Sequence, residues 1–175
     1  GGANASPNVA HVSREQMRQW LEPTDIDGAY AVQEINTLFW QAQGRRIVGR
    51  KAGLTARAVQ VQLGVDQPDF GVLFDDMEIA DGDNLDPARA IQPKAEAEIA
   101  FILGKDLPSP DTTPEQVADA VANVHAAIEI VDSRIADWKI TFADTVADNG
   151  SSAFFVLAKD GKPLPGLDIW TAGMV

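Results

Sequence analysis

Apolar and polar positions alternate along residues 95–103, which read AEAEIAFIL. Every second residue from Ala95 to Leu103 is apolar, and the intervening positions begin with Glu96 and Glu98. Because successive side chains of a strand point to opposite faces, this pattern predicts a strand with one apolar face. On a helix, residues two positions apart would point away from each other. The two carboxylates therefore lie side by side, where they repel and are costly to desolvate, so we expect a partner that neutralises them.

The first third of the chain has the patterns of three helices and one short strand. Ser13 and Gln16 form a capping-box pattern, and Pro23 ends the helix that they open. Thr55 is expected to cap a later helix that Gly64 closes. A helical stripe of apolar residues lies between these two. The predicted helices cover residues 13–23, 25–44 (with the stripe at Ala31, Ile35, Leu38 and Phe39) and 56–64, and the predicted strand covers residues 45–53.

Loops, strands and helices alternate in the rest of the chain. Residues 65–77 contain Pro68 and Gly71 and are predicted to form a loop. Thr113 can cap a helix that begins at Pro114 and continues to residue 124. The other predicted elements are strands at residues 125–135 and 151–158, and a helix at residues 137–150 that ends near Asn149.

These elements together predict an α+β fold. We expect a disordered tail at residues 1–12, an N-terminal helical and mixed α/β segment at residues 13–75, and a mixed β-sheet core at residues 76–175. The 175 residues, 45% of them hydrophobic, are enough for one sizeable domain. The net charge of -12 argues against a nucleic acid partner, and no apolar run approaches the length of a membrane span. With no cysteine in the chain, we expect a cytoplasmic protein without disulfides.

The pair of Glu96 and Glu98 is a candidate metal site. Carboxylate oxygens suit Mg²⁺ or Mn²⁺, and a third acidic ligand would complete the set. Two residues of the strand predicted at residues 125–135 could supply it, Glu129 and Asp132. The alternative is that both carboxylates line a solvated sheet face.

Lys51 is a second candidate, because it lies among glycines between a predicted strand and a predicted helix. Backbone without Cβ atoms can approach a ligand closely there. The segment GRRIVGRK is similar to a phosphate-binding loop, but Arg50 follows the glycine and no Ser or Thr follows Lys51, so we do not expect a nucleotide site. An ordinary surface lysine is the alternative.

Three blocks of sequence resemble the 2-keto-4-pentenoate (2-hydroxypentadienoate) hydratases of the fumarylacetoacetate hydrolase superfamily. The blocks occupy residues 44–77, 93–103 and 129–152, and they occur in the order and spacing of the family. The resemblance runs from about residue 29 to residue 175. The segments QLGVDQPDFG and DWKITFADTVADN are more similar to the hydratases than to the related 4-oxalocrotonate decarboxylases.

The resemblance implies a divalent ion and a set of site residues. It assigns the third metal ligand to Glu129 rather than Asp132, beside Glu96 and Glu98. The implied catalytic residues are Lys51 and Asp76, and the implied substrate-binding residue is Ser151. Gly150 departs from the family, where an alanine is more usual.

The implied activity is hydration of a 2-hydroxy-2,4-dienoate to a 4-hydroxy-2-oxo acid in aromatic meta-cleavage catabolism. A 4-oxalocrotonate-type decarboxylase is the alternative. The resemblance also implies that the family continues beyond the last residues present here, so we expect a fumarylacetoacetate hydrolase-like β core that is incomplete at its C-terminal end. A third hypothesis is therefore a non-catalytic partner subunit. We expect a homo-oligomer with contacts on the strands around residues 98–103 and 152–157. We also expect association with a decarboxylase or aldolase of the same pathway, and a small-molecule substrate.

Overall fold

The structure of the protein is a computed structural model, which describes residue 15 and residues 18–107, 109–169 and 171–173. Helices and strands alternate along the chain, so the predicted α+β class is confirmed. The prediction of a tail at residues 1–12 lies outside the described residues. The helices are α2 (Ile26–Ala42), α3 (Arg57–Leu63), α4 (Pro114–Ala120) and α5 (Phe142–Ala147). The strands are β1 (Ile47–Gly53), β2 (Asp69–Phe74), β3 (Glu78–Ile79), β4 (Lys94–Leu103), β5 (Val121–Val131) and β6 (Ser152–Leu157).

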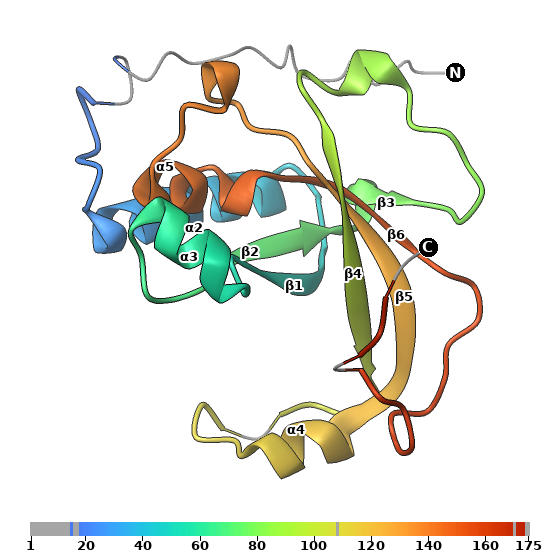
Figure 1. Ribbon diagram of the computed structural model, residues 1–175. Coiled ribbons are helices and arrows are strands. Elements are labelled where there is room, and N and C mark those ends of the chain that lie inside the picture. Colours follow the sequence, from blue (N-terminus) through green and yellow to red (C-terminus); the bar gives the residue numbers. More distant parts are fainter. Residues whose placement is uncertain (1–14, 16–17, 108, 170, 174–175) are drawn as a thin grey trace.

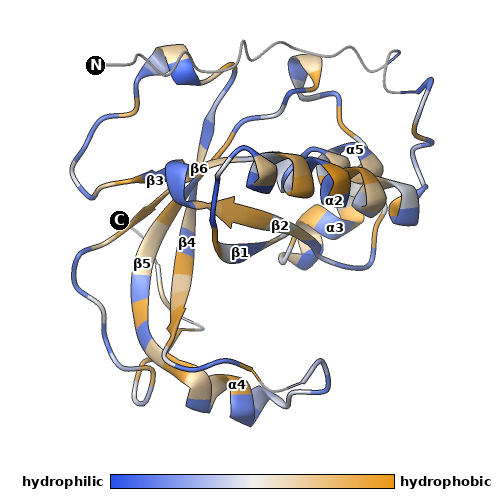
Figure 2. Cartoon of the chain, turned by 180° about the vertical axis from the view of Figure 1, so that it is seen from behind, coloured by the Kyte–Doolittle hydropathy of each residue, from blue (hydrophilic) through white to orange (hydrophobic). Residues whose placement is uncertain are grey.

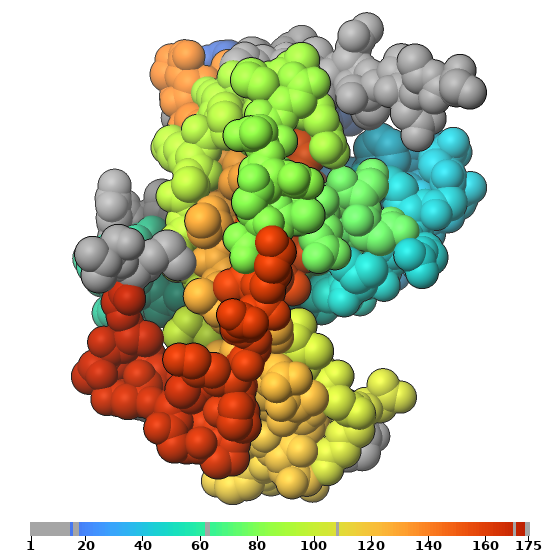
Figure 3. Space-filling view, turned by 90° about the vertical axis from the view of Figure 1, so that its right-hand side faces the viewer, coloured from blue at the N-terminus to red at the C-terminus, as the bar shows by residue number. Residues whose placement is uncertain are grey.

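The described strands form two sheets. β1 and β2 make an antiparallel pair, and the larger sheet has the order β3-β6-β5-β4. This larger sheet is mixed, because β3 runs parallel to β6 while the other neighbours are antiparallel. Helices α2, α3 and α5 lie beside the β1–β2 pair, and α4 lies at the far end of the long strands β4 and β5 (Figure 1). The chain after β6 turns back beside the start of β5, where Lys162 pairs with Val124 (Figure 3).

Two small apolar clusters hold the helices and the sheets together. In the first, α2 and the preceding loop pack on α5; in the second, β2 and the turn after it pack on β6. The second cluster therefore joins the two sheets and fixes the position of β1 relative to β5. Buried residues of the first cluster are Leu21, Ala29, Phe142, Ala143, Val146 and Ala147; those of the second are Val72, Phe74, Met77 and Phe155.

Helix α2 confirms the prediction for residues 25–44 but not the face that it buries. Asp25 caps the helix by accepting a hydrogen bond from the Gly28 backbone N–H. The buried residues are Ala29 and Gln33, whereas the predicted apolar stripe is open to solvent, with Leu38 59% exposed and Phe39 53% exposed. Gln33 is tolerated inside because its Nε2 donates to the carbonyls of Phe70 and Val146, at 2.9 and 2.8 Å.

The prediction of a loop at residues 65–77 is wrong, because β2 occupies Asp69–Phe74 and is largely apolar (Figure 2). Pro68 precedes the strand and so removes no ladder hydrogen bond. Gly71 lies inside it, at a place where the backbone of another segment approaches: a Cβ on Gly71 would lie 2.6 Å from the Asn149 carbonyl oxygen. The glycine that suggested a turn therefore marks a close contact.

Other predicted boundaries also shift. The helix capped by Thr113 is confirmed but ends at Ala120, since the β-branched residues from Val121 onward join β5 instead of extending the helix. Ala56, not Thr55, is the N-cap of α3. The predicted helix at residues 137–150 is α-helical only in α5, which Thr141 caps, and short 3₁₀ turns at Ala136–Trp138 and Asn149–Ser151 lie on either side of it. The helix at residues 13–23 lies partly outside the described residues, and residues 18–20 form a turn. The division of the chain after residue 75 stays a prediction.

Candidate metal centre and its lysine

Antiparallel pairing of β4 with β5 brings the three predicted carboxylates together. Glu96 lies directly opposite Glu129 in the register, so the two side chains leave the same face of the sheet. Glu98 follows two residues later on that face. One carboxylate oxygen from each of the three residues lies within 4.8 Å of the others. The structure thus assembles the predicted set, while the role of these residues as metal ligands stays a prediction.

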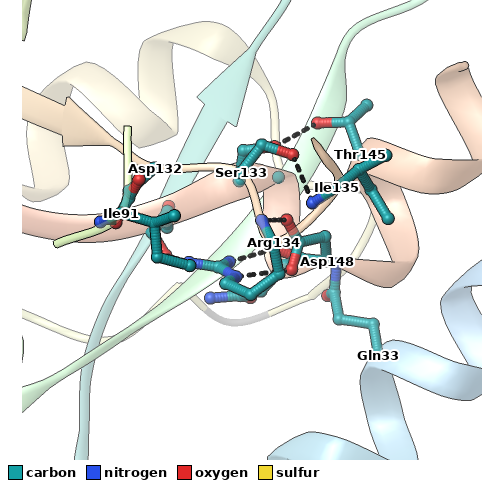
Figure 4. A network of polar contacts seen from close by, with 12 residues as sticks. Gln33, Ile91, Asp132, Ser133, Arg134, Ile135, Thr145 and Asp148 are labelled. Atoms are coloured by element: carbon teal, nitrogen blue, oxygen red, sulfur yellow. Dashed lines mark hydrogen bonds and ion pairs between the residues drawn. The ribbon is translucent and has the colours of Figure 1, made fainter. Parts of the chain in front are cut away.

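Asp132, the other candidate for a third ligand, instead hydrogen-bonds to the backbone. Its side chain is buried and accepts hydrogen bonds from the backbone N–H groups of Ile91 and Gln92, at 2.8 and 2.7 Å. It therefore holds the segment that leads into β4 (Figure 4). Among the described residues, the one group of acidic side chains close enough to share an ion is Glu96, Glu98 and Glu129.

The chemistry of this group fits a divalent cation. The set offers only oxygen atoms, which hard ions such as Mg²⁺ prefer. Desolvation of its carboxyl group raises the pKa of Glu98, and the negative charges of Glu129 and Glu96 raise it further, while Lys51 opposes them. A bound cation would offset this repulsion. Glu129 is buried, whereas Glu96 and Glu98 are exposed, so the site is open on the side of β4.

Lys51 reaches this group from the smaller sheet. Its Nζ lies 3.2 Å from Glu129 Oε1, and both side chains are largely buried, with 11% and 8% exposed. The same ammonium donates to the Gly150 carbonyl at 2.6 Å. A Cβ on Gly150 would lie 2.9 Å from the Lys51 Nζ, and Gly150 has a φ of 64°, so an alanine here would displace the lysine or strain the loop. Lys51 is therefore not an ordinary surface lysine.

Asp69 is a buried acidic neighbour of Lys51 that the sequence did not indicate. It lies at the start of β2, opposite Gly53, and is only 2% exposed. A Cβ on Gly53 would meet both the Asp69 carboxylate and the Lys51 Nζ, so the two groups converge. Among the described residues, Asp69 Oδ1 has no hydrogen-bond partner, and Oδ2 accepts from Thr145 Oγ1 at 3.4 Å. An unpaired carboxylate oxygen buried beside a lysine is typical of a functional group.

Asp76 is not brought into this group. Its side chain is 55% exposed and pairs with Arg45, whose guanidinium lies 2.6 Å from Oδ1. Lys51 pairs with Gly71 in the β1–β2 ladder, and Asp76 comes five residues later. Strand β2 ends at Phe74, and Asp76 lies in the 3₁₀ turn Asp75–Met77 that follows, beyond the end of the strand that pairs with Lys51. The geometry supports Asp69, not Asp76, as the acidic neighbour of Lys51.

Ser151 lies in a tight turn beside the lysine. Asn149, Gly150 and Ser151 all have positive φ, which is rare for residues with a Cβ. The Ser151 side chain is buried, and its Oγ lies 3.3 Å from the Oγ1 of Thr145. Ser151 is thus linked through Thr145 to Asp69 and follows directly after the glycine that holds Lys51.

The fold and site define a fumarylacetoacetate hydrolase-like α+β protein with a group of three carboxylates that could hold a metal ion. The chain is 54% identical over 158 residues to "2-keto-4-pentenoate hydratase 2" of Dechloromonas aromatica (strain RCB). The aligned region covers 90% of this chain and 60% of that protein. It is 46% identical over 151 residues to "2-hydroxyhexa-2,4-dienoate hydratase" of Comamonas testosteroni, covering 85% of this chain and 57% of that protein. No family model matches the chain.

Solved structures of a 4-oxalocrotonate decarboxylase have the same fold as this chain. The 4-oxalocrotonate decarboxylase from Pseudomonas putida G7, complexed with magnesium and adipate, superposes with a TM-score of 0.84 at 32% identity, covering 94% of this chain and 62% of that one. The same enzyme complexed with calcium and acetate gives a TM-score of 0.81. The chain is a homologue of the 2-keto-4-pentenoate hydratases, so the resemblance predicted from the sequence is confirmed. It spans about three fifths of the length of the relatives that it matches.

Proposed function

We propose that the chain takes part in the hydration of a 2-hydroxy-2,4-dienoate to a 4-hydroxy-2-oxo acid. The observation that carries this proposal is the convergence of Lys51 on Glu129, inside a group of three carboxylates. Relatives at about half identity are named hydratases of such acids, which supports the same class of substrate.

Glu96, Glu98 and Glu129 would hold the metal ion, Mg²⁺ or Mn²⁺. When bound, this ion supplies Lewis-acid stabilisation of negative charge on the 2-oxygen of the substrate. Glu129 is the ligand that the protein orients most strongly, because it is buried and in contact with Lys51.

Lys51 and Asp69 are the groups placed to handle protons. The unpaired Asp69 Oδ1 can accept a proton from the attacking water, and the Lys51 Nζ carries protons that it can donate on the same side. The burial of both groups excludes bulk water from the transfer. The resemblance implies Asp76 as the second catalytic residue, but its position supports this role less well, because its side chain is exposed to solvent and pairs with Arg45. Ser151 remains the candidate for binding the substrate carboxylate.

A substrate panel tests this proposal. Purified protein with Mg²⁺ is given a 2-hydroxydienoate mono-acid and, separately, an unsaturated 2-oxo diacid. We expect loss of the dienoate absorbance with the mono-acid, without release of CO₂, and no loss after the ion is removed with a chelator. Ion-independent hydration, or no hydration by a chain that binds Mg²⁺, would contradict the proposal.

A decarboxylase is the second candidate, favoured by the decarboxylase structures that share this fold. The same panel separates the two activities, because a decarboxylase releases CO₂ from the diacid. Sequence identity is 32% to the decarboxylase and 46–56% to the hydratases, which supports hydration.

We also propose that the protein forms a homo-oligomer in the cytoplasm, where a decarboxylase or aldolase of the same pathway could associate with it. Exposed apolar residues at the end of β4 support self-association: Phe101, Ile102 and Leu103 are 44%, 37% and 48% exposed. Strand β6, the other predicted contact region, pairs with β5 and β3 and buries Phe154 and Phe155, so it offers less surface. No helix in the described part of the chain is long and apolar enough to cross a membrane.

A further inference from the structure

Ser152 makes a contact that neither the sequence pattern nor the relatives' names assign. Its hydroxyl donates to Glu129 Oε1 at 2.8 Å, and both residues are buried, at 5% and 7% exposed. Lys51 lies 3.2 Å from the same oxygen. Lys51 also donates to the other oxygen, Oε2, at 3.5 Å, so the serine and the lysine together fix the orientation of the buried carboxylate.

An irregularity in the ladder puts the serine on this face. Glu129 lies opposite Phe155 and Ile130 opposite Phe154, but the next pair is Val131 with Ser152, so Ala153 is an extra residue in β6. Val131 and Glu129 are two residues apart and share a face.

Without the extra residue, Ser152 would share the face of Phe154, two positions away, and would point to the side of the sheet opposite Glu129. The β-bulge at Ala153 turns it toward the carboxylate. Bulges next to functional sites often re-aim a side chain in this way.

The backbone of Ser152 is held in place from the other side. Arg134 Nη1 donates to the Ser152 carbonyl at 3.2 Å, and its Nη2 donates to the Asp148 carbonyl at 2.8 Å. The Arg134 Nε lies 2.6 Å from Asp148 Oδ1 (Figure 4). The guanidinium thus ties together both ends of the turn at residues 148–152 and fixes the backbone position from which the serine hydroxyl reaches Glu129.

We propose that Ser152 is a positioning residue for the metal centre: the bulge in β6 turns its hydroxyl onto Glu129 and orients that carboxylate for the ion. This inference rests on the proposed function of the three carboxylates. Residues that hydrogen-bond to a metal ligand typically change metal affinity 10–100-fold when they are removed.

The test measures binding of Mg²⁺ and Mn²⁺, without substrate, by isothermal titration calorimetry. We expect Ser152→Ala to weaken binding about 10–100-fold and Ser152→Thr, which keeps the hydroxyl, to recover it. Ser133→Ala is the matched control, because Ser133 is also buried but its Oγ accepts a hydrogen bond from the Ile135 N–H. If Ser152→Ala does not fold, Ser152→Cys takes its place. Cysteine is similar in size to serine but is only a weak hydrogen-bond donor, so this variant should show the same loss of metal affinity.

The outcomes separate the inference from the proposed function. If the parent chain binds an ion and Ser152→Ala binds it equally well, the positioning role is overturned and the metal centre stands. A threonine variant as weak as the alanine variant also overturns the role, since the loss would then come from packing. If the parent chain binds neither ion, the metal centre and the role of Ser152 are both refuted.

Discussion

The Lys51 ammonium lies 3.2 Å from Glu129 Oε1, although the two residues belong to different sheets. Lys51 comes from the β1–β2 pair and Glu129 from the central part of the larger sheet. The apolar cluster of β2 and β6 maintains this distance, since it packs the two sheets together. The position of the lysine over the carboxylates therefore depends on the tertiary fold and not on any local motif.

Replacing Lys51 by methionine should abolish turnover while leaving metal binding intact. The change keeps much of the side chain but removes the proton donor, and loss of a general acid or base typically costs about 10²–10⁴-fold in rate. It also removes a positive charge near the ion, so affinity for Mg²⁺ should stay equal or rise. Steady-state hydration and calorimetry measure the two effects.

Lys105→Met is the control for this change, because Lys105 is an exposed lysine paired with Asp119 on the surface. It should leave both rate and affinity unchanged. Wild-type activity in Lys51→Met would show that the buried lysine is structural.

Two aspartates give opposite expectations. Asp69→Asn removes the buried carboxylate beside Lys51 and should lower the hydration rate by at least about 10²-fold. Asp76→Asn alters an exposed residue that pairs with Arg45 and should change the rate less than about threefold. Both variants keep the shape of the side chain, so each serves as a control for the other. The reverse order of effects would restore Asp76 to the catalytic role.

The sequence predicted the grouping of the three carboxylates better than the surroundings of Lys51, and the reason is physical. Glu96 and Glu98 share a face because of strand period alone, which a single sequence reveals. Whether Glu129 or Asp132 joins this pair depends on the register of β4 with β5, which strand period alone does not fix. Asp69 was hidden because Pro68 and Gly71 flank it and suggested a loop.

The helical stripe of α2 shows the other limit of sequence reasoning. Ile35 and Leu38 have the helical spacing of buried residues, yet they are 66% and 59% exposed. Gln33 is buried instead, because two carbonyls from β2 and α5 accept its hydrogen bonds. Periodicity reveals that a helix has two faces, but the partners that the fold supplies determine which face is covered.

Glu98→Gln should weaken metal binding yet stabilise the ion-free protein near neutral pH. The pKa of Glu98 is raised, so its contribution to stability is present below the ordinary pKa of a glutamate and is lost as the pH rises through the raised value. Glutamine removes both the repulsion and one charged ligand. Calorimetry should show a loss of affinity of about tenfold or more, and thermal unfolding without the ion should shift upward.

The same raised pKa predicts a pH dependence of ion binding. Protons compete with the ion for Glu98, so affinity should begin to fall at a higher pH than for an ordinary glutamate. Glu115→Gln is the control, since the pKa of this exposed residue is lowered by hydrogen bonds at the start of α4. A parent chain with pH-independent affinity across the mildly acidic range would contradict the expectation.

Asn149→Ala should destabilise the protein by roughly 2–4 kcal/mol. The Asn149 side chain hydrogen-bonds to both backbone groups of Val72, as a neighbouring strand would. Its Oδ1 accepts from the Val72 N–H at 2.7 Å, and its Nδ2 donates to the Val72 carbonyl at 2.9 Å. Each buried group left unpaired costs about 1–3 kcal/mol. The backbone φ of 59° adds to the cost for alanine. Urea unfolding measures the free energy, and Asn123→Ala on an exposed part of β5 should change it by less than about 0.5 kcal/mol.

Polar substitutions at the end of β4 should reduce self-association. Within the described residues, β4 pairs only with β5, so its other edge has unpaired backbone groups beside the exposed side chains of Phe101 and Leu103. Such an edge favours pairing with another chain. The double variant Phe101→Thr, Leu103→Thr keeps residues that favour strands but removes apolar surface, so sedimentation velocity should show a shift toward monomer. Val48→Thr is the control, because Val48 is equally exposed at 52% but lies on β1. A parent chain that stays monomeric at high concentration, or a control that dissociates as far as the double variant, would show that this edge is not the contact.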